Sequence, residues 1–143
     1  MPGPSNSERR PRLGIAVSRF NEELTSRMLR TAEQHAASLG CTLSQVLHVP
    51  GAYDLPLAVK KLLQRRDVDA VVTLGAVIAG ETGHDEVILS ALAPALTQLS
   101  LEFMKPVALG VIGPATEAQA EARAEEYPKR AVEAAVQMLA ALR

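Results

Sequence analysis

Short apolar runs alternate with segments of helical periodicity along this chain. Apolar residues fill positions 13–17, 68–78 and 107–112, and positions 41–49 show a weaker alternation. Runs of this length, bounded by polar residues, Gly or Pro, are typical of strands in a parallel sheet. The run at 68–78 is nearly continuous in Val, Ala, Leu and Ile, so we expect it to be the central strand, covered on both faces.

The intervening segments have apolar residues at three- and four-residue spacing. This pattern predicts helices over residues 21–40, 55–63, 83–103 and 116–142. The expected boundary signals are Asn21 and Asp54 as caps, Gly40 as a stop, Pro94 as a kink, Gly113-Pro114 as the end of the fourth strand, a capping box between Thr116 and Gln119, and a possible break at Pro128.

Strands that alternate with helices in this way predict an α/β fold. We expect a three-layer αβα sandwich with a four-stranded parallel sheet, flavodoxin-like, with right-handed crossovers. In such folds, ligands bind at the carboxyl ends of the strands. The candidate loops at that edge are residues 18–21, 49–54, 76–84 and 110–114. A response-regulator-like module is a weaker alternative, because paired acidic residues do not follow the first strand.

Composition narrows the class of protein. With 143 residues, of which 48% are hydrophobic, the chain has the size of one domain, expected over 12–143. Residues 1–11 are rich in Pro, Ser and charge, so we expect a disordered or partner-bound leader. The net charge of −1 argues against general nucleic-acid binding. The lone Cys41 and the lack of a membrane-spanning or signal-like run favour a cytoplasmic protein without a membrane partner.

The stretch GETGHDE at residues 80–86 lies where the central strand passes into the next helix. Thr82 and Asp85 have the spacing of a capping box, and His84 is expected in the first helical turn between them. A histidine beside carboxylates at such a position can move protons near neutral pH. The acidic residues here oppose anion binding, so a bound phosphate needs a cation from elsewhere. The candidates for that cation are Arg123, Lys129 and Arg130.

Two other loops at this edge carry candidate ligand-binding residues. Phe20 follows the first strand and can either enter the core or stack on a planar ligand. Gly51 and Ala52 permit close approach of a ligand to the backbone, with Tyr53 and Asp54 beside them, although the same residues suit a simple turn. Neither metal-ligand spacing nor a nucleotide-binding glycine pattern is present, so no cofactor or metal is predicted.

Five motifs resemble the lumazine synthase family in order, from about residue 13 to 142, and are most similar to its archaeal-type branch. They are VSRFN (17–21), VPGAYDLPLAVKKLL (49–63), GAVIAGETGHDEVI (75–88), KPVALGVIGP (105–114) and KRAVEAAV (129–136). The resemblance implies a transferase of riboflavin biosynthesis. Such enzymes condense 5-amino-6-(D-ribitylamino)uracil with 3,4-dihydroxy-2-butanone 4-phosphate into 6,7-dimethyl-8-ribityllumazine and release phosphate and water, without a cofactor.

The resemblance also assigns roles to single residues. His84 matches the proposed proton-transfer group, and Arg123 matches the arginine that holds the phosphate. The implied substrate-binding set is Phe20 and Asn21 in the first loop, Gly51, Ala52, Tyr53 and Asp54 in the second, Ala76, Val77 and Ile78 at the central strand, Glu81 and Thr82 in the phosphate-binding turn, and Leu109 and Arg123 from a neighbouring subunit. Phe20 is expected to stack on the pyrimidine.

The family forms homopentamers or sixty-subunit icosahedral shells, with each site at a seam between subunits. The resemblance therefore implies a homo-oligomer, and either size remains open. Tyr53, Asp54 and Leu109 differ from the residues that many relatives carry. Two alternatives follow: an archaeal-type riboflavin synthase of the same fold, and a non-catalytic shell protein that binds flavin or lumazine.

Overall fold

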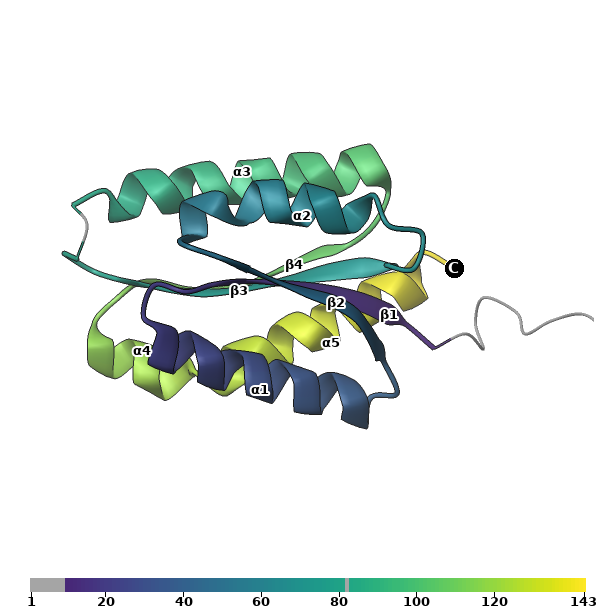
Figure 1. Ribbon diagram of the computed structural model, residues 1–143, viewed down its shortest axis with the longest axis horizontal. Coiled ribbons are helices and arrows are strands. Elements are labelled where there is room, and N and C mark those ends of the chain that lie inside the picture. The colour runs from purple at the N-terminus through teal and green to yellow at the C-terminus, as the bar shows by residue number, and fades with distance from the viewer. Residues whose placement is uncertain (1–9, 82) are drawn as a thin grey trace, which may run out of the picture.

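The computed structural model describes residues 10–81 and 83–143, which form one parallel sheet covered by helices on both faces (Figure 1). The sheet has the strand order β2-β1-β3-β4, so β3 lies between two neighbours as predicted for the central strand. The strands are β1 (Arg12–Ser18), β2 (Thr42–Val49), β3 (Ala70–Ile78) and β4 (Val107–Ala115). The predicted four-stranded parallel sheet is confirmed.

Helices cover the two faces unequally. One layer contains α1 (Glu22–Ser38), α4 (Glu117–Arg123) and α5 (Glu126–Ala141), and the other contains α2 (Leu55–Leu63) and α3 (Asp85–Phe103) (Figure 1). A 3-10 turn at Ala52–Asp54 leads into α2. This arrangement confirms the predicted three-layer αβα sandwich. None of the helices in the described ranges is long and apolar enough to cross a membrane.

The core lies on both faces of the sheet. Leu13, Ile15 and Val17 of β1 pack in the cluster that contains α1 and α5, whereas Ala16 points into the opposite cluster with Leu55 of α2. Alternate residues of a strand face opposite sides of the sheet. A strand that is covered by helices on both faces therefore needs apolar residues at nearly every position. This requirement explains the continuous apolar runs of β1 and β3.

The fourth strand extends further than predicted. β4 continues through Gly113 and Pro114 to Ala115, so the prediction that Gly113-Pro114 ends this strand was wrong. The peptide bond between them is cis, and Gly113 has a φ of 131°, which favours glycine. Because β4 is an edge strand, the missing N–H of Pro114 is tolerated there, and Ala115 still pairs with Ile78 after a register shift.

The last helical region is divided earlier than predicted. The break lies between α4 and α5, at residues 124–125, whereas Pro128 is in the first turn of α5. Proline is acceptable in a first turn because its missing N–H would have no intrahelical partner. The predicted capping box of α4 is confirmed: Gln119 N donates to Thr116 Oγ1 at 3.1 Å, and Thr116 N donates to Gln119 Oε1 at 3.0 Å. Gly40, with a φ of 80°, follows the end of α1 as predicted.

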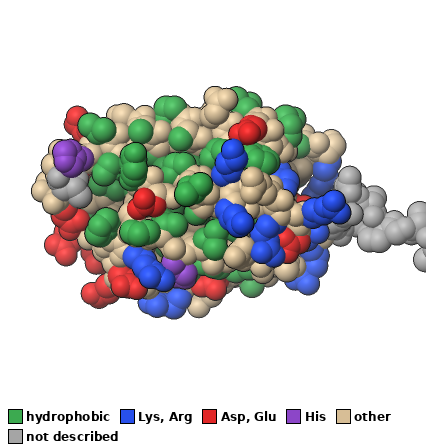
Figure 2. All heavy atoms as spheres, turned by 45° about the horizontal axis from the view of Figure 1, so that its top comes forward, with side chains coloured by type: hydrophobic (Ala, Val, Ile, Leu, Met, Phe, Trp, Pro, Cys, Tyr) green, Lys and Arg blue, Asp and Glu red, His purple; other side chains and the backbone are tan. Residues whose placement is uncertain are grey.

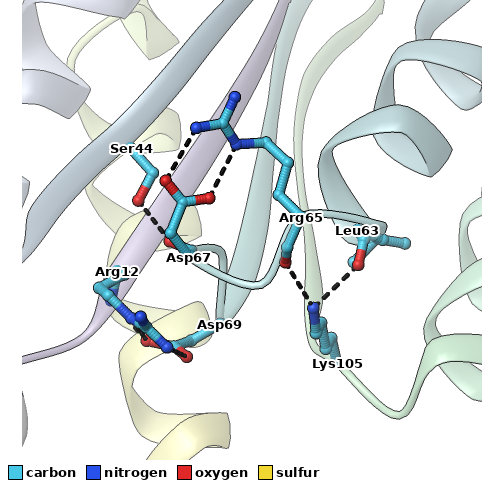
Figure 3. Close-up of polar contacts among 7 residues, drawn as sticks. All are labelled: Arg12, Ser44, Leu63, Arg65, Asp67, Asp69 and Lys105. Atoms are coloured by element: carbon cyan, nitrogen blue, oxygen red, sulfur yellow. Dashed lines mark hydrogen bonds and ion pairs between the residues drawn. The ribbon is translucent and has the colours of Figure 1, made fainter.

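Polar contacts tie the strands together at their amino ends, opposite the candidate site (Figure 3). Arg12 forms a two-pronged contact with Asp69, through Nε at 3.1 Å and Nη2 at 2.9 Å. Arg65 forms another with Asp67, and this hydrogen bond lowers the pKa of the Asp67 carboxyl. Lys105 donates to the backbone oxygens of Leu63 and Arg65. These contacts lie at the end of the sheet opposite the candidate loops.

The chain before β1 is also tied to this amino edge. Arg10 Nε donates to Gly40 O at 2.8 Å, and Thr42 N donates to Pro11 O at 2.8 Å. The rest of the predicted leader, residues 1–9, lies outside the described residues.

Candidate active site

The carboxyl ends of β1, β2 and β3 bring three of the predicted loops together. Phe20 follows β1, and the backbone of its loop is bound to the loop after β2: Arg19 N donates to Val49 O at 2.8 Å, and Phe20 N donates to Pro50 O at 3.0 Å. The Phe20 ring is 64% exposed, so the interpretation as a core residue is wrong. An exposed aromatic ring held by its backbone is available to stack on a planar ligand.

Gly51 allows the Phe20 ring to lie against the second loop. A Cβ at Gly51 would be 2.8 Å from Phe20 Cδ2 and 2.9 Å from Cε2, closer than atoms can pack. The absence of a side chain is therefore what permits this ring position. Gly51 N also donates to Asp54 Oδ2 at 3.0 Å, so Asp54 closes its own turn and makes no capping hydrogen bond to α2, contrary to the prediction.

Asn21 connects the first loop to the third. It lies at the start of α1 in the left-handed conformation, with a φ of 63°, and its side chain makes no capping hydrogen bond, so the predicted capping function was wrong. Its amide nitrogen instead donates to Ala76 O at 3.0 Å and to Glu81 Oε2 at 3.2 Å. The side chain of Asn21 thus holds the Glu81 loop beside Phe20. The left-handed backbone is one that asparagine tolerates better than most residues.

The loop between β3 and α3 turns twice through glycines in the left-handed region. Gly80 has a φ of 87° and Gly83 a φ of 72°. Gly80 N donates to Asp85 Oδ2 at 2.7 Å, and Glu81 N donates to Ile78 O at 3.3 Å. These two N–H groups therefore have partners within the loop. Thr82, the predicted capping residue and phosphate contact, lies outside the described residues.

The helix α3 begins at Asp85, two residues later than predicted. His84 directly precedes α3, with a φ of −120° that is not helical, so it is not in the first turn as predicted. Its side chain is exposed at the edge that also carries Phe20. Figure 2 shows acidic side chains gathered toward one end of the molecule, with Lys and Arg side chains beside them along the lower margin as well as toward the opposite end. The imidazole of His84 is therefore accessible to a ligand.

Among the remaining predicted residues of these loops, most are buried and Tyr53 is exposed. Ala76 and Val77 are buried at the end of β3, and Ile78 is partly buried. Ala52 is buried beneath the 3-10 turn, whereas Tyr53 is 73% exposed and borders a hollow of about 300 Å³ against Ile88 of α3. Tyr53 therefore lies on the α2–α3 side of its loop.

Within the described part of the chain, neither Leu109 nor Arg123 is joined to this cluster by a register pair, side-chain hydrogen bond or ion pair. Leu109 is 54% exposed in the middle of β4, where its register partner is Thr73. Arg123 ends α4, and its guanidinium carbon is 5.8 Å from the centroid of the Tyr127 ring. Tyr127 was missed by sequence reasoning, although it is one of only four aromatic residues.

A metal centre finds no support in the described ranges. No group of three or more His, Cys, Asp or Glu side chains there could hold a metal ion. Cys41 is buried below β2, and burial raises the pKa of its thiol, which makes it a poor nucleophile. His84, with Phe20 and the glycine loops around it, remains the arrangement that can bind a planar ligand and exchange protons with it.

Comparisons with known proteins identify the family of this chain. The family model described as 6,7-dimethyl-8-ribityllumazine synthase matches residues 10–143. A protein of that name from Metallosphaera sedula is 55% identical over 133 residues, which cover 92% of this chain and 88% of the relative. Proteins of the same name from Saccharolobus islandicus and Methanococcus maripaludis are 53% and 52% identical, with 86% and 96% of their lengths covered. The chain belongs to the 6,7-dimethyl-8-ribityllumazine synthase family.

Proposed function

We propose that this chain condenses 5-amino-6-(D-ribitylamino)uracil with 3,4-dihydroxy-2-butanone 4-phosphate to give 6,7-dimethyl-8-ribityllumazine, phosphate and water. The match to one family over residues 10–143 carries this proposal. The relatives described above are named as lumazine synthases, which favours this reaction over the riboflavin synthase alternative.

The pyrimidine substrate is proposed to bind between the first three loops. Phe20 stacks on its ring, and Gly51, Ala52 and Asp54 contact the ribityl chain. The close packing of Phe20 on Gly51 supports this role, because it fixes the ring next to the backbone that receives the ribityl group. The main chain of Ala76, Val77 and Ile78 faces the heterocycle. Asn21 and Tyr53 are proposed to lie at the edge of this substrate site, where Asn21 holds the Glu81 loop in place.

The phosphate is proposed to bind at the turn of Glu81 and Thr82, opposite Arg123 of a neighbouring subunit. Acidic residues crowd this turn, so a dianion needs an external cation. Arg130 is less suited because its Nη2 already pairs with Glu126 Oε1 at 2.7 Å. Lys129 borders a hollow with His35 of α1. These contacts favour Arg123, whose planar guanidinium can bind a phosphate through two parallel hydrogen bonds.

His84 is proposed to transfer protons during the reaction. The 5-amino group attacks the ketone and loses water to form an imine, phosphate then leaves, and the ribitylamino nitrogen closes the ring with loss of a further water. Each step moves a proton, so one imidazole that titrates near neutral pH can serve several of them. Positioning of the two substrates supplies most of the rate, since bound reactants gain a high effective concentration.

The active form is proposed to be a homopentamer, alone or as part of a sixty-subunit shell in the cytoplasm, with Leu109 and Arg123 completing the site of the adjacent subunit. Large apolar side chains on the α2–α3 layer support assembly: Tyr53, Leu57 and Val87 are 73%, 78% and 70% exposed in one copy. Exposed apolar surface of this kind marks a protein interface. Light scattering after size-exclusion chromatography distinguishes about five from about sixty subunits, and a monomer would contradict the proposal.

The reaction is tested by mixing the purified protein with both substrates and following lumazine absorbance. A rate no higher than that of the uncatalysed condensation would refute the proposed function. Riboflavin formed from lumazine alone would favour the riboflavin synthase alternative, and tight flavin binding without turnover would favour the non-catalytic shell protein.

The role of His84 is tested by its substitution, with His48 as the matched control. His84→Ala should lower kcat by roughly tenfold to a hundredfold, at the low end for general acid–base catalysis because positioning is retained. His48→Ala changes an exposed histidine of β2 outside the proposed set and should leave the rate within about twofold. Equal losses in the two variants would contradict a specific role for His84.

A further inference from the structure

The α4–α5 junction holds Arg123 against an aromatic ring. Arg123 is the last residue of α4, and Tyr127 lies in the first turn of α5, so their contact crosses the break between the two helices. The guanidinium carbon is 5.8 Å from the centroid of the Tyr127 ring, within the range of a cation–π interaction. This is a contact between two elements and not a pairing within one regular helix.

The Tyr127 ring is itself held by the core. It is partly buried and packs against the cluster of buried residues that includes Ala124 and Ala131. Both alanines have 4% or less of their surface exposed. A ring that is packed in this way has little freedom to turn, so it offers Arg123 a fixed surface.

Two of the acidic residues near Arg123 in the chain pair with other arginines. Glu121 pairs with Arg27 of α1, and Glu126 pairs with Arg130. Within the described residues, Arg123 makes no ion pair or hydrogen bond with a carboxylate of its own. A carboxylate partner would occupy the N–H groups and cancel the charge, whereas an aromatic ring contacts only the flat face of the guanidinium. Stacking therefore leaves the N–H edge and the charge available to an anion.

We infer that Tyr127 is a positioning residue, which orients Arg123 so that its N–H edge meets the phosphate monoester of the butanone substrate. The inference rests on the proposed function, in which Arg123 binds that phosphate. An arginine side chain has several rotatable bonds, and an arginine already confined by the ring loses less freedom on binding. Tyr127 does not touch the substrate, and its effect passes through Arg123.

Steady-state kinetics of Tyr127→Leu and Tyr127→Phe test this inference. Tyr127→Leu should raise the KM for butanone phosphate and the inhibition constant of inorganic phosphate by roughly three- to tenfold. The KM for ribitylaminouracil should change far less. Tyr127→Phe should rescue both values, because the interaction uses the ring face and not the hydroxyl. Failure of Tyr127→Phe to rescue them would overturn the inference.

The double variant separates positioning from a general structural effect. In an Arg123→Gln background, Tyr127→Leu should have no further effect on the KM for butanone phosphate, because the group it orients is gone. An undiminished effect there would overturn the inference. Light scattering checks assembly of each variant, and Tyr127→Met, which also lacks the ring, replaces Tyr127→Leu if the latter fails to assemble.

The outcomes distinguish this inference from the proposed function. If Arg123→Gln leaves the KM for butanone phosphate unchanged, the phosphate role of Arg123 itself is wrong. If Arg123→Gln raises that KM and Tyr127→Leu does not, only the positioning role of Tyr127 is wrong.

Discussion

The ring of Phe20 lies so close to Gly51 that a methyl group added at Gly51 would displace the ring. The backbone of Gly51 is extended, with a φ of −135°, so alanine is conformationally acceptable there. The conflict is with the ring alone, at 2.8 Å and 2.9 Å. Because the ring is largely exposed, it can move aside at little cost to folding but not without leaving its proposed stacking position.

Gly51→Ala should therefore impair binding more than stability. We expect the KM for ribitylaminouracil to rise roughly three- to tenfold, which corresponds to losing part of an aromatic stacking interaction. The midpoint of thermal unfolding should change little. In a Phe20→Leu background the same substitution should have a smaller effect on KM, and an undiminished effect would show that the ring is not the cause.

At the scale of elements, the strands were more predictable than their ends. β1 and β3 are covered on both faces, so burial alone fixes their apolar character and the sequence shows it directly. The end of β4 depends on its place at the sheet edge, where Pro114 is tolerated, and that place is a property of the tertiary fold. Asn21 was taken for a cap because the residue type suits one, whereas contacts with Ala76 and Glu81, distant in sequence, determine its role.

The candidate site likewise has a part that the sequence predicts and a part that it does not. The loops that contain Phe20, Gly51 and His84 were predictable, because parallel strands place their carboxyl ends at one edge. The role of Tyr127 was not predictable, since it depends on how α5 packs beside the end of α4.

The capping box of α4 offers a test at this scale, because α4 carries Arg123. Thr116→Ala should lower the free energy of unfolding by about 1 kcal/mol, the usual cost of removing a threonine cap. Gln119→Ala should lower it by less, since only the reciprocal hydrogen bond is lost. Urea unfolding at one fixed protein concentration measures both changes.

Gln137→Ala is the matched control for the capping box. Gln137 is an exposed residue of α5, where alanine is a better helix former, so no loss of stability is expected. A loss as large as that of Thr116→Ala would mean that the capping hydrogen bonds are not what stabilises α4.

At the scale of the whole molecule, the proposed site takes residues from two copies of the chain. Phe20, Gly51 and His84 gather at one end, whereas Arg123 is held on Tyr127 away from any contact with them in the described chain. In the described residues, the Glu81 side chain pairs with Asn21 and not with a cation, and we propose that Arg123 of a neighbouring copy supplies the positive charge for the phosphate. In the proposed symmetric assembly, each seam between subunits joins the Phe20 and His84 loops of one copy to Arg123 of the next.

Mixing two impaired variants tests this division directly. His84→Ala subunits retain Arg123, and Arg123→Gln subunits retain His84, so a seam between the two kinds contains one intact site. Random co-assembly of equal amounts should restore about a quarter of the wild-type sites. Co-expressed variants should therefore show that fraction of activity above the residual rates of the two single variants, measured at equal total protein.

The control is a mixture of the two variants assembled separately, which should remain at the average of their residual rates. Equal activity in the co-assembled and separately assembled mixtures would place both residues in the site of a single subunit. That result would contradict the shared site while leaving the chemistry of His84 intact, because the His84→Ala defect is measured in a uniform assembly. Only a site built from two copies predicts that two damaged chains are more active together than apart.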